Sequence, residues 1–181
     1  MDAGLFLDRD GTIIVDWGYG CRPERVALLP GAKEALRVAA RRFNVYLVTN
    51  QSGVSRGYFT LEDVEACNRR MLELLEAPDL FAGMCVATEH PDEPAVYRKP
   101  SPNYILERIE RDGLEASRCW MVGDRLSDLQ CGVAAGVNAA LLDTTPHGRT
   151  PEIAEYVRKH GIPVFASLKE FVENGELRIE N

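Results

Sequence analysis

Two aspartates that stand one residue apart, Asp8 and Asp10, are the first candidates for chemistry in this sequence. They follow a short apolar run, 4–7, that is typical of a strand buried on both faces of a parallel sheet. Ligands of such sheets bind outside the carboxyl ends of the strands. Two neighbouring carboxylates repel each other unless a shared proton or a cation neutralises them, and Mg²⁺ prefers oxygen ligands. The alternative is a strand that stops at a polar turn with both carboxylates solvated, and Asp-x-Asp alone does not decide between the two.

Further polar residues follow three later strand-like segments. Thr49 ends the second, Lys99 follows a loop after the third, and Asp124 and Asp128 come after the fourth. Because the carboxyl ends of parallel strands meet at one edge of a sheet, we expect these side chains to converge. A hydroxyl, an ammonium and several carboxylates suit phosphoryl transfer, in which a carboxylate can act as nucleophile and form an aspartyl-phosphate. Taken singly, each has a plainer interpretation: a strand end for Thr49, a solvated loop lysine for Lys99, and a favourable helix-dipole position for Asp128.

The elements that must position these residues alternate between strand and helix, which predicts an α/β fold with a central parallel sheet and helices on both faces. Beyond the first strand, the expected strands are 44–48, 84–88, 119–122, 137–142 and 163–166. The expected helices are 31–42, a helix from the N-cap Thr60 to near Pro78, a helix from the N-cap Ser101 to Gly113 with Pro102 as its first residue, 127–135, 152–159 and 167–174. Apolar spacing predicts that two of these helices bury Leu61, Val64, Met71, Leu72 and Leu75, and Ile105, Leu106 and Ile109, respectively. Residues 15–30 are predicted to form an irregular flap over the end of the first strand.

Composition limits the possible classes of protein. A chain of 181 residues with 45% hydrophobic residues is expected to form one domain, 1–181. The net charge of −7 argues against a nucleic-acid-binding or membrane-binding surface. The five cysteines are scattered singly, which favours a reduced, cytoplasmic setting over a disulfide framework. We find no signal peptide and no apolar run of membrane-spanning length, and we expect a monomer.

Together the motifs make the chain resemble the haloacid-dehalogenase-like (HAD) phosphatases. Asp8-Arg9-Asp10-Gly11-Thr12, Thr49, Lys99, and Gly123-Asp124 with Asp128 match the four motifs of that superfamily in order. Within it the chain is similar to the histidinol-phosphatase and D-glycero-D-manno-heptose-1,7-bisphosphate phosphatase group. The matching segments are 16–19, 49–57, 98–100 and 123–125, and the resemblance covers nearly the whole chain.

The resemblance implies a Rossmann-like HAD fold and a role for each motif residue. Asp8 would be the nucleophile and Asp10 the acid and base, while Thr49 and Lys99 would hold the phosphoryl oxygens. Magnesium would bind Asp8, the Asp10 carbonyl and Asp124, and Asp128 would either support the metal site or orient Lys99. The implied substrate-binding residues are Asn50, Gln51, Ser52, Arg98 and Arg125. Trp17 and Tyr19 are either anchors of the flap or substrate contacts.

Two features set limits on this resemblance. Members of the group usually carry a zinc loop, Cys-x-His and then Cys-x-Cys just before Arg-Lys-Pro, but the aligned positions hold Ala87, Glu89, Ala95 and Tyr97, so we expect no zinc. The intervals between the motifs also leave no room for a large cap domain, so the site should be open.

The resulting hypothesis is a magnesium-dependent phosphoric monoester hydrolase that acts on a small phosphorylated metabolite. A sugar phosphate such as D-glycero-D-manno-heptose 1,7-bisphosphate is the leading substrate and histidinol phosphate the alternative. A non-catalytic sugar-phosphate-binding module is the competing class, although both Asp8 and Asp10 are intact.

Overall fold

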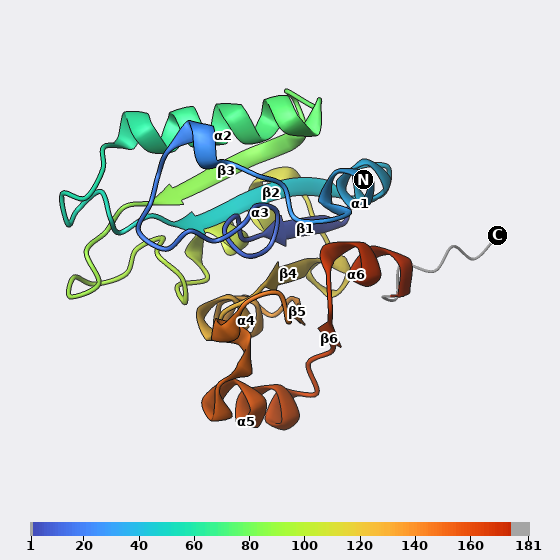
Figure 1. Cartoon of the computed structure of the whole chain (residues 1–181). Helices are drawn as coiled ribbons and strands as arrows, with labels where there is room; N and C mark the ends of the chain where they lie inside the picture. The colour runs from blue at the N-terminus through green and yellow to red at the C-terminus, as the bar shows by residue number, and fades with distance from the viewer. Residues whose placement is uncertain (1, 175–181) are drawn as a thin grey trace.

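The computed structural model describes residues 2–174, which form a six-stranded, all-parallel sheet in the order β3-β2-β1-β4-β5-β6 (Figure 1). The strands are β1 (Gly4–Leu7), β2 (Asn44–Asn50), β3 (Phe81–Ala87), β4 (Trp120–Gly123), β5 (Asn138–Leu142) and β6 (Val164–Phe165). The α-helices are α1 (Ala32–Ala39), α2 (Leu61–Leu75), α3 (Asn103–Asp112), α4 (Leu126–Ala134), α5 (Pro151–His160) and α6 (Leu168–Asn174), with short 3-10 helices η1 (Pro23–Arg25), η2 (Ala116–Arg118) and η3 (Pro146–Arg149). The predicted parallel α/β fold is therefore confirmed.

Helices cover both faces of the sheet. On β1, Leu5 and Leu7 belong to a core cluster with residues of α1, α2 and α6, whereas Phe6 belongs to a second cluster with residues of α3 and α4. Because successive side chains of a strand point to opposite faces, these two clusters lie on the two sides of the sheet. All four residues of β1 are buried, as expected for a strand covered on both faces.

The central position of β1 places its carboxyl end among the ends of its neighbours. Leu5 pairs with Val45 of β2 on one side and with Trp120 of β4 on the other. The pairing continues past the strand, since the Asp8 N–H donates to the Val122 carbonyl at 3.0 Å. The residues that follow β1, β2 and β4 are therefore held side by side at one edge of the sheet.

Helix α2 has the predicted N-cap, in which the Thr60 hydroxyl accepts from the Asp63 N–H and the Asp63 carboxylate accepts from the Thr60 N–H. The predicted burial of Leu61 is wrong, because this first helical residue is 45% exposed. Cys67 and Asn68 instead complete the buried stripe of α2.

Helix α3 also differs in detail. It begins at Asn103 with Pro102 as the N-cap, and the Ser101 hydroxyl donates to the Val96 carbonyl at 2.6 Å. The predicted N-cap at Ser101 was therefore one residue too early. Leu106 is 44% exposed, and the predicted burial of this residue is wrong. The buried face of α3 is narrow and consists of Tyr104 and Ile105, so a residue rotated by one further position lies outside it.

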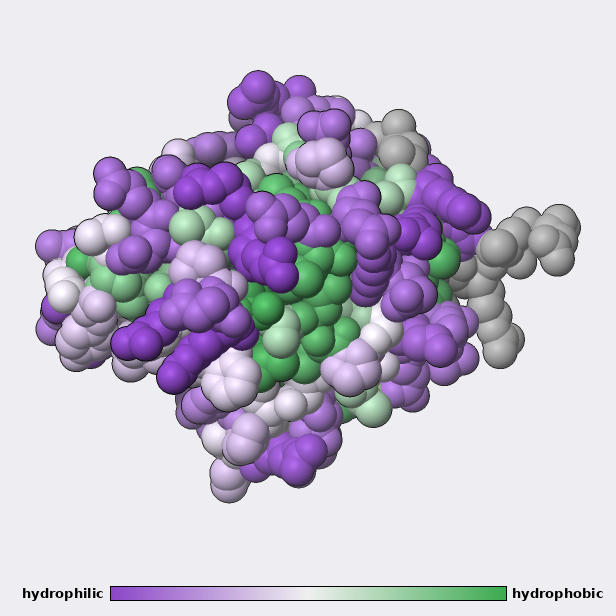
Figure 2. All heavy atoms as spheres, turned by 45° about the horizontal axis from the view of Figure 1, so that its top comes forward, coloured by the Kyte–Doolittle hydropathy of each residue, from purple (hydrophilic) through white to green (hydrophobic). Residues whose placement is uncertain are grey.

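The expected flap, 15–30, contains η1 and folds back so that Ile14 bridges Leu28. Between β2 and β3, the described chain forms a loop and α2, without a separate cap domain. No helix in the described part of the chain is long and apolar enough to cross a membrane. On the face drawn in Figure 2, hydrophilic side chains surround a hydrophobic area near the centre.

Candidate active site

Lys99 joins two carboxylates at the carboxyl edge of the sheet. Its Nζ lies 2.8 Å from Asp8 Oδ1 and 2.7 Å from Asp128 Oδ1, and it donates to the Val48 carbonyl at 2.7 Å. Burial disfavours a charged ammonium, but the attraction of Asp128 and Asp8 outweighs it and raises the pKa of Lys99 above its ordinary value. Lys99 is therefore a fixed positive charge beside Asp8, and the interpretation of this residue as a solvated loop lysine is wrong.

Asp124 completes an acidic cluster with Asp8 and Asp128, whose carboxylate oxygens all lie within 4.8 Å of one another. One oxygen of Asp124 accepts from the Thr145 hydroxyl at 2.5 Å, and the other, Oδ1, is buried without a hydrogen-bond partner. Burial and the neighbouring carboxylates of Asp8 and Asp128 raise the pKa of Asp124 to about 7. The three clustered carboxylates, of which Asp8 and Asp128 contact the Lys99 ammonium, and the unpaired buried oxygen of Asp124 fit a hard divalent cation.

Gly11 allows the close approach of Asp124 to the first motif. It has a positive φ of 76°, and a Cβ atom at this position would lie 2.6 Å from Asp124 Oδ2. Any larger residue would therefore be strained and would displace the carboxylate. The Thr144 hydroxyl also donates to the Gly11 carbonyl, which fastens the loop after β5 to the first motif.

Asp10 is held by a side-on pair with its neighbour Arg9. Arg9 Nε and Nη2 donate to the two carboxylate oxygens at 3.1 and 3.2 Å, while Nη1 donates to Asn68 Oδ1 of α2 at 2.9 Å. Gln51 Nε2 donates to Asp10 Oδ2 at 2.9 Å and to the Thr49 hydroxyl at 2.8 Å. Burial raises the pKa of Asp10, although Arg9 acts in the opposite direction. A carboxyl group held in this way can exchange a proton with a group in the pocket.

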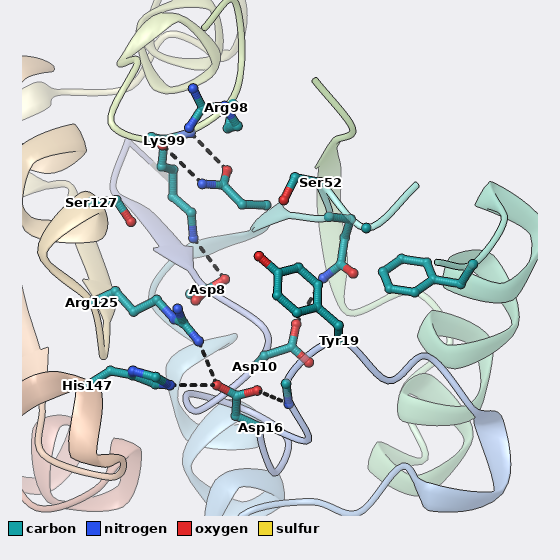
Figure 3. Close-up of a pocket in the computed structure, with 15 residues that line it drawn as sticks. Asp8, Asp10, Asp16, Tyr19, Ser52, Arg98, Lys99, Arg125, Ser127 and His147 are labelled. Carbon is teal, nitrogen blue, oxygen red and sulfur yellow. Dashed lines mark hydrogen bonds and ion pairs between the residues drawn. The ribbon is translucent and has the colours of Figure 1, made fainter. Parts of the chain in front are cut away.

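A pocket of about 330 Å³ opens above these groups (Figure 3). The predicted residues that line it are Asp8, Asp10, Asn50, Gln51, Ser52, Arg98, Lys99 and Arg125. Thr49, Asp124 and Asp128 are not among the lining residues but are buried beside them. The structure thus brings the predicted residues together at one edge of the sheet.

Asn50 and Arg98 connect the pocket to the loop after β3. Asn50 exchanges two hydrogen bonds with the backbone of Lys99, accepting from its N–H at 2.9 Å and donating to its carbonyl at 3.0 Å. Arg98 donates from Nη2 to the Pro91 carbonyl at 3.1 Å, and its buried Nε has no hydrogen-bond partner. Asn50 therefore positions Lys99, and Arg98 keeps donor capacity for an anion.

The flap supplies the opposite wall of the pocket. Asp16 accepts from Arg125 Nη2 at 2.8 Å and lies 3.7 Å from His147 Nε2, and the three side chains gather at one side of the pocket in Figure 3. Tyr19 lines the pocket, whereas Trp17 donates to the Arg25 carbonyl at 2.9 Å and does not line it. Of the two residues whose role the sequence left open, Trp17 braces the flap and Tyr19 faces the site.

Several of these residues were missed in the sequence. Asn68 stands within a helical stripe with nothing to mark it, His147 is isolated in the sequence, and Thr145 precedes a proline in a loop. Arg9 belongs to the first motif, but its pairing with Asp10 carries no signal in the spacing. Asp16 could have been found, since it belongs to the same shared segment, 16–19, as Tyr19, which the sequence did single out.

Comparisons with known proteins show which proteins this chain is similar to. A family model described as HAD-hydrolase-like matches residues 96–171. A Mesorhizobium japonicum protein named D-glycero-beta-D-manno-heptose-1,7-bisphosphate 7-phosphatase is 41% identical over 144 residues, which cover 74% of this chain and 65% of that protein. The chain therefore spans just under two thirds of this relative's length. A protein of the same name from Helicobacter pylori (strain J99) is 36% identical over 153 residues, which cover 83% of this chain and 88% of that protein.

A solved structure extends the match to nearly the full length. The D,D-heptose 1,7-bisphosphate phosphatase from B. bronchiseptica, complexed with magnesium and phosphate, gives a TM-score of 0.82 at 28% identity. The alignment covers 96% of this chain and 97% of that chain. These matches place the chain in the class of the HAD-like hydrolases.

Within that class the chain belongs to the family of the D-glycero-D-manno-heptose-1,7-bisphosphate 7-phosphatases. The resemblance inferred from the four motifs is thus confirmed, and so is the predicted enzyme class, since the relatives are named as phosphatases.

Proposed function

We propose that this protein is a magnesium-dependent phosphatase that hydrolyses a phosphate monoester of a small sugar through an aspartyl-phosphate on Asp8. The observation that supports this most directly is the contact of Asp8 with Lys99 at 2.8 Å, beside the acidic cluster and at the base of the pocket. The names of its relatives favour the 7-phosphate of D-glycero-D-manno-heptose 1,7-bisphosphate as the group removed.

Asp8 is the proposed nucleophile. One of its carboxylate oxygens forms a bond to phosphorus while the bond between phosphorus and the sugar oxygen breaks. Lys99 offsets negative charge on the transferring phosphoryl oxygens, and the Thr49 hydroxyl donates to one of them. Asp128 holds Lys99 in place with its ion pair at 2.7 Å.

Asp10 is the proposed acid and base. It gives a proton to the departing sugar oxygen, and the resulting carboxylate then removes a proton from the water that attacks the phosphorus of the aspartyl-phosphate. This second step releases inorganic phosphate and regenerates Asp8. Arg9 and Gln51 fix the direction in which the Asp10 carboxyl points.

The proposed metal site consists of the carboxylates of Asp8, Asp124 and Asp128 together with the backbone carbonyl of Asp10. Bound Mg²⁺ would neutralise the crowded carboxylates and offset negative charge on the phosphoryl group. We expect no zinc, because Ala87, Glu89, Ala95 and Tyr97 offer no thiolate or imidazole ligand. The expectation of a monomer is likewise left as a prediction.

Substrate specificity is assigned to the pocket walls. We propose that Gln51, Ser52 and Arg125 contact the sugar and that Arg98 binds its second phosphate, because a guanidinium group can bind phosphate with two donors. Asn50 contributes through the Lys99 backbone that it holds.

The test is phosphate release from a panel of substrates with and without Mg²⁺. The panel contains both anomers of D-glycero-D-manno-heptose 1,7-bisphosphate, hexose bisphosphates, histidinol phosphate and 4-nitrophenyl phosphate. The proposal expects the highest kcat/KM for a heptose bisphosphate. Preference for histidinol phosphate would overturn the substrate assignment, and binding without turnover of any compound would identify a non-catalytic module.

A further inference from the structure

Two cysteines from distant parts of the chain touch beside the active site. Cys21 of the flap and Cys67 of α2 are separated by 46 positions in sequence, and their Sγ atoms lie 2.9 Å apart. A disulfide bond would shorten this separation by about 0.9 Å. The structure has both as free thiols, buried with Val64 in a small apolar cluster.

The other three cysteines have different surroundings. Cys119 donates to the Glu115 carbonyl and Cys131 to the Ser101 carbonyl, both at 3.2 Å. Cys85 lies in the core cluster between the sheet and α3. Among the described residues, Cys21 and Cys67 are therefore the one pair of thiols in contact.

We propose that Cys21 and Cys67 form a reversible disulfide that tethers the flap to α2 when the protein meets a low-molecular-weight disulfide as oxidant. The inference is independent of the substrate assignment, since it rests on the geometry of the two thiols and not on the reaction.

The exchange proceeds in two steps with glutathione disulfide as the oxidant. The Cys21 thiolate attacks one sulfur of the oxidant, the oxidant's S–S bond breaks, and one glutathione thiolate leaves. The Cys67 thiol then gives its proton to the glutathione thiolate that has left, and its sulfur attacks the Cys21 sulfur of this mixed disulfide and expels the second glutathione thiolate. The protein loses two electrons and two protons, and one glutathione disulfide becomes two glutathione thiols.

Accessibility assigns the order of attack. Cys21 is 8% exposed and lies in the irregular flap, whereas Cys67 is 2% exposed within a helix. Burial raises the pKa of Cys67 to about 12, which keeps this thiol protonated and slow to react with an external oxidant. Local opening of the flap is therefore the step that admits the oxidant.

The tether would act on the wall of the active-site pocket. Tyr19, two residues before Cys21, lines the pocket, and its ring packs edge-on against Tyr58 with centroids 5.1 Å apart. Trp17 and η1 lie in the same flap. A bond at Cys21 fixes this segment to α2 at its base and restricts its opening.

The experiment incubates the reduced full-length protein with glutathione disulfide and then counts free thiols and maps linked peptides by mass spectrometry. The expected result is a fall from five thiols to three, a Cys21–Cys67 peptide pair, and full reversal by dithiothreitol. In a second arm, unfolded reduced protein is refolded in a glutathione redox buffer, so that access to the thiols is not limiting. Five free thiols in both arms, or a different pairing, would overturn the proposal.

Two further measurements test whether the disulfide restricts opening of the flap. Trypsin should cleave after Arg25 of the flap at least about tenfold more slowly in the oxidised protein, because local opening is restricted. The midpoint of thermal unfolding should rise by about 5–10 °C. Unchanged cleavage in a protein that carries the mapped disulfide would overturn the assignment of a tether.

Three variants control the measurement. Cys21→Ser should keep its four free thiols under the same oxidant, whereas Cys67→Ser should stop at the mixed disulfide of Cys21 with glutathione. Neither variant should form a link between the flap and α2, so the tryptic cleavage of neither should slow. Cys85→Ser is the matched control, since this cysteine is also buried, and it should still form the Cys21–Cys67 disulfide.

Discussion

Asp8 stands where an ammonium meets an acidic cluster, so its charge is compensated and its oxygen faces the pocket. We predict that Asp8→Asn lowers kcat by at least about 10³-fold, because an amide cannot form the aspartyl-phosphate. Steady-state kinetics on 4-nitrophenyl phosphate measure this loss, and urea unfolding should show that the variant remains folded. Turnover near the wild-type rate would contradict the covalent mechanism.

Asp10 has a different expected signature, because its proton matters most when the leaving group is poor. Asp10→Asn should lower kcat for a sugar phosphate by about 10²–10⁴-fold, and the loss for 4-nitrophenyl phosphate should be distinctly smaller. Asp143→Asn is the matched control, since this aspartate pairs with Arg149 and does not line the pocket. Equal losses on both substrates would argue against the role of Asp10 as acid.

Arg98 is expected to affect the binding of the substrate and not the chemical step. Its Nε lacks a partner, so we predict that Arg98→Ala raises KM for a sugar bisphosphate by about tenfold or more, while KM for 4-nitrophenyl phosphate changes little. Arg118→Ala provides the control, since Arg118 precedes the amino end of β4 and does not line the pocket. A similar rise in KM for both substrates would show that Arg98 does not bind the second phosphate.

Among single residues, the sequence predicts the charged groups of the site better than the residues that hold them in place. Asp8, Lys99 and Asp124 follow strand ends, and strand ends of a parallel sheet meet at one edge. Asn68 and Thr145 act through single hydrogen bonds whose partners lie far away in the sequence. No regular spacing in the sequence marks such hydrogen bonds, because they depend on how the helices and strands pack.

Helix α2 is the element that connects the packing of the protein to its acid and base. It carries Asn68, which is buried and accepts from Arg9, the partner of Asp10. We predict that Asn68→Ala lowers the free energy of unfolding by about 1–3 kcal/mol, because a buried guanidinium donor loses its partner. Urea unfolding measures this change.

The same variant should slow turnover of a sugar phosphate more than that of 4-nitrophenyl phosphate, since Asp10 loses part of its orientation. Arg70→Ala, an exposed change on the same helix, should alter the stability by less than about 0.5 kcal/mol. If Asn68→Ala behaves like Arg70→Ala, the proposed support of Arg9 by α2 is wrong.

The order and type of the elements follow from the sequence, and their limits do so less well. Alternating apolar segments predicted each strand, but β2 continues to Asn50 beyond its apolar run. Strand β3 begins earlier than predicted, at Phe81, because Phe81 already pairs with Val45 of β2. Leu61 and Leu106 fit a helical stripe, yet the width of the buried face depends on what packs against the helix. Single-sequence periodicity does not contain that information.

For the molecule as a whole, the proposed metal site predicts a coupling between magnesium and stability. Removal of metal with a chelator should abolish activity, and added Mg²⁺ should restore it. At about 100 times its Kd, the ion should stabilise the fold by about 2.7 kcal/mol and raise the midpoint of thermal unfolding by about 5–10 °C.

Asp124→Asn should remove most of this thermal shift, while Asp143→Asn should retain it. Activity in chelated, metal-free buffer equal to that with Mg²⁺ would contradict the magnesium requirement. A shift that persists in Asp124→Asn would place the ion elsewhere.

The central place of β1 has a consequence for the order in which the protein forms. Val45, the partner of Leu5 in β2, is translated early, but the partner of Leu5 on the other side, Trp120, is translated much later. Until β4 docks, β1 has an open edge, and Asp124 and Asp128 are absent from the carboxyl end of the sheet. Pairing over such a long stretch of chain is slow because a large loop must close first. Magnesium binding during refolding should therefore appear late, and the time at which it appears would report when β4 docks against β1 and joins the two halves of the sheet.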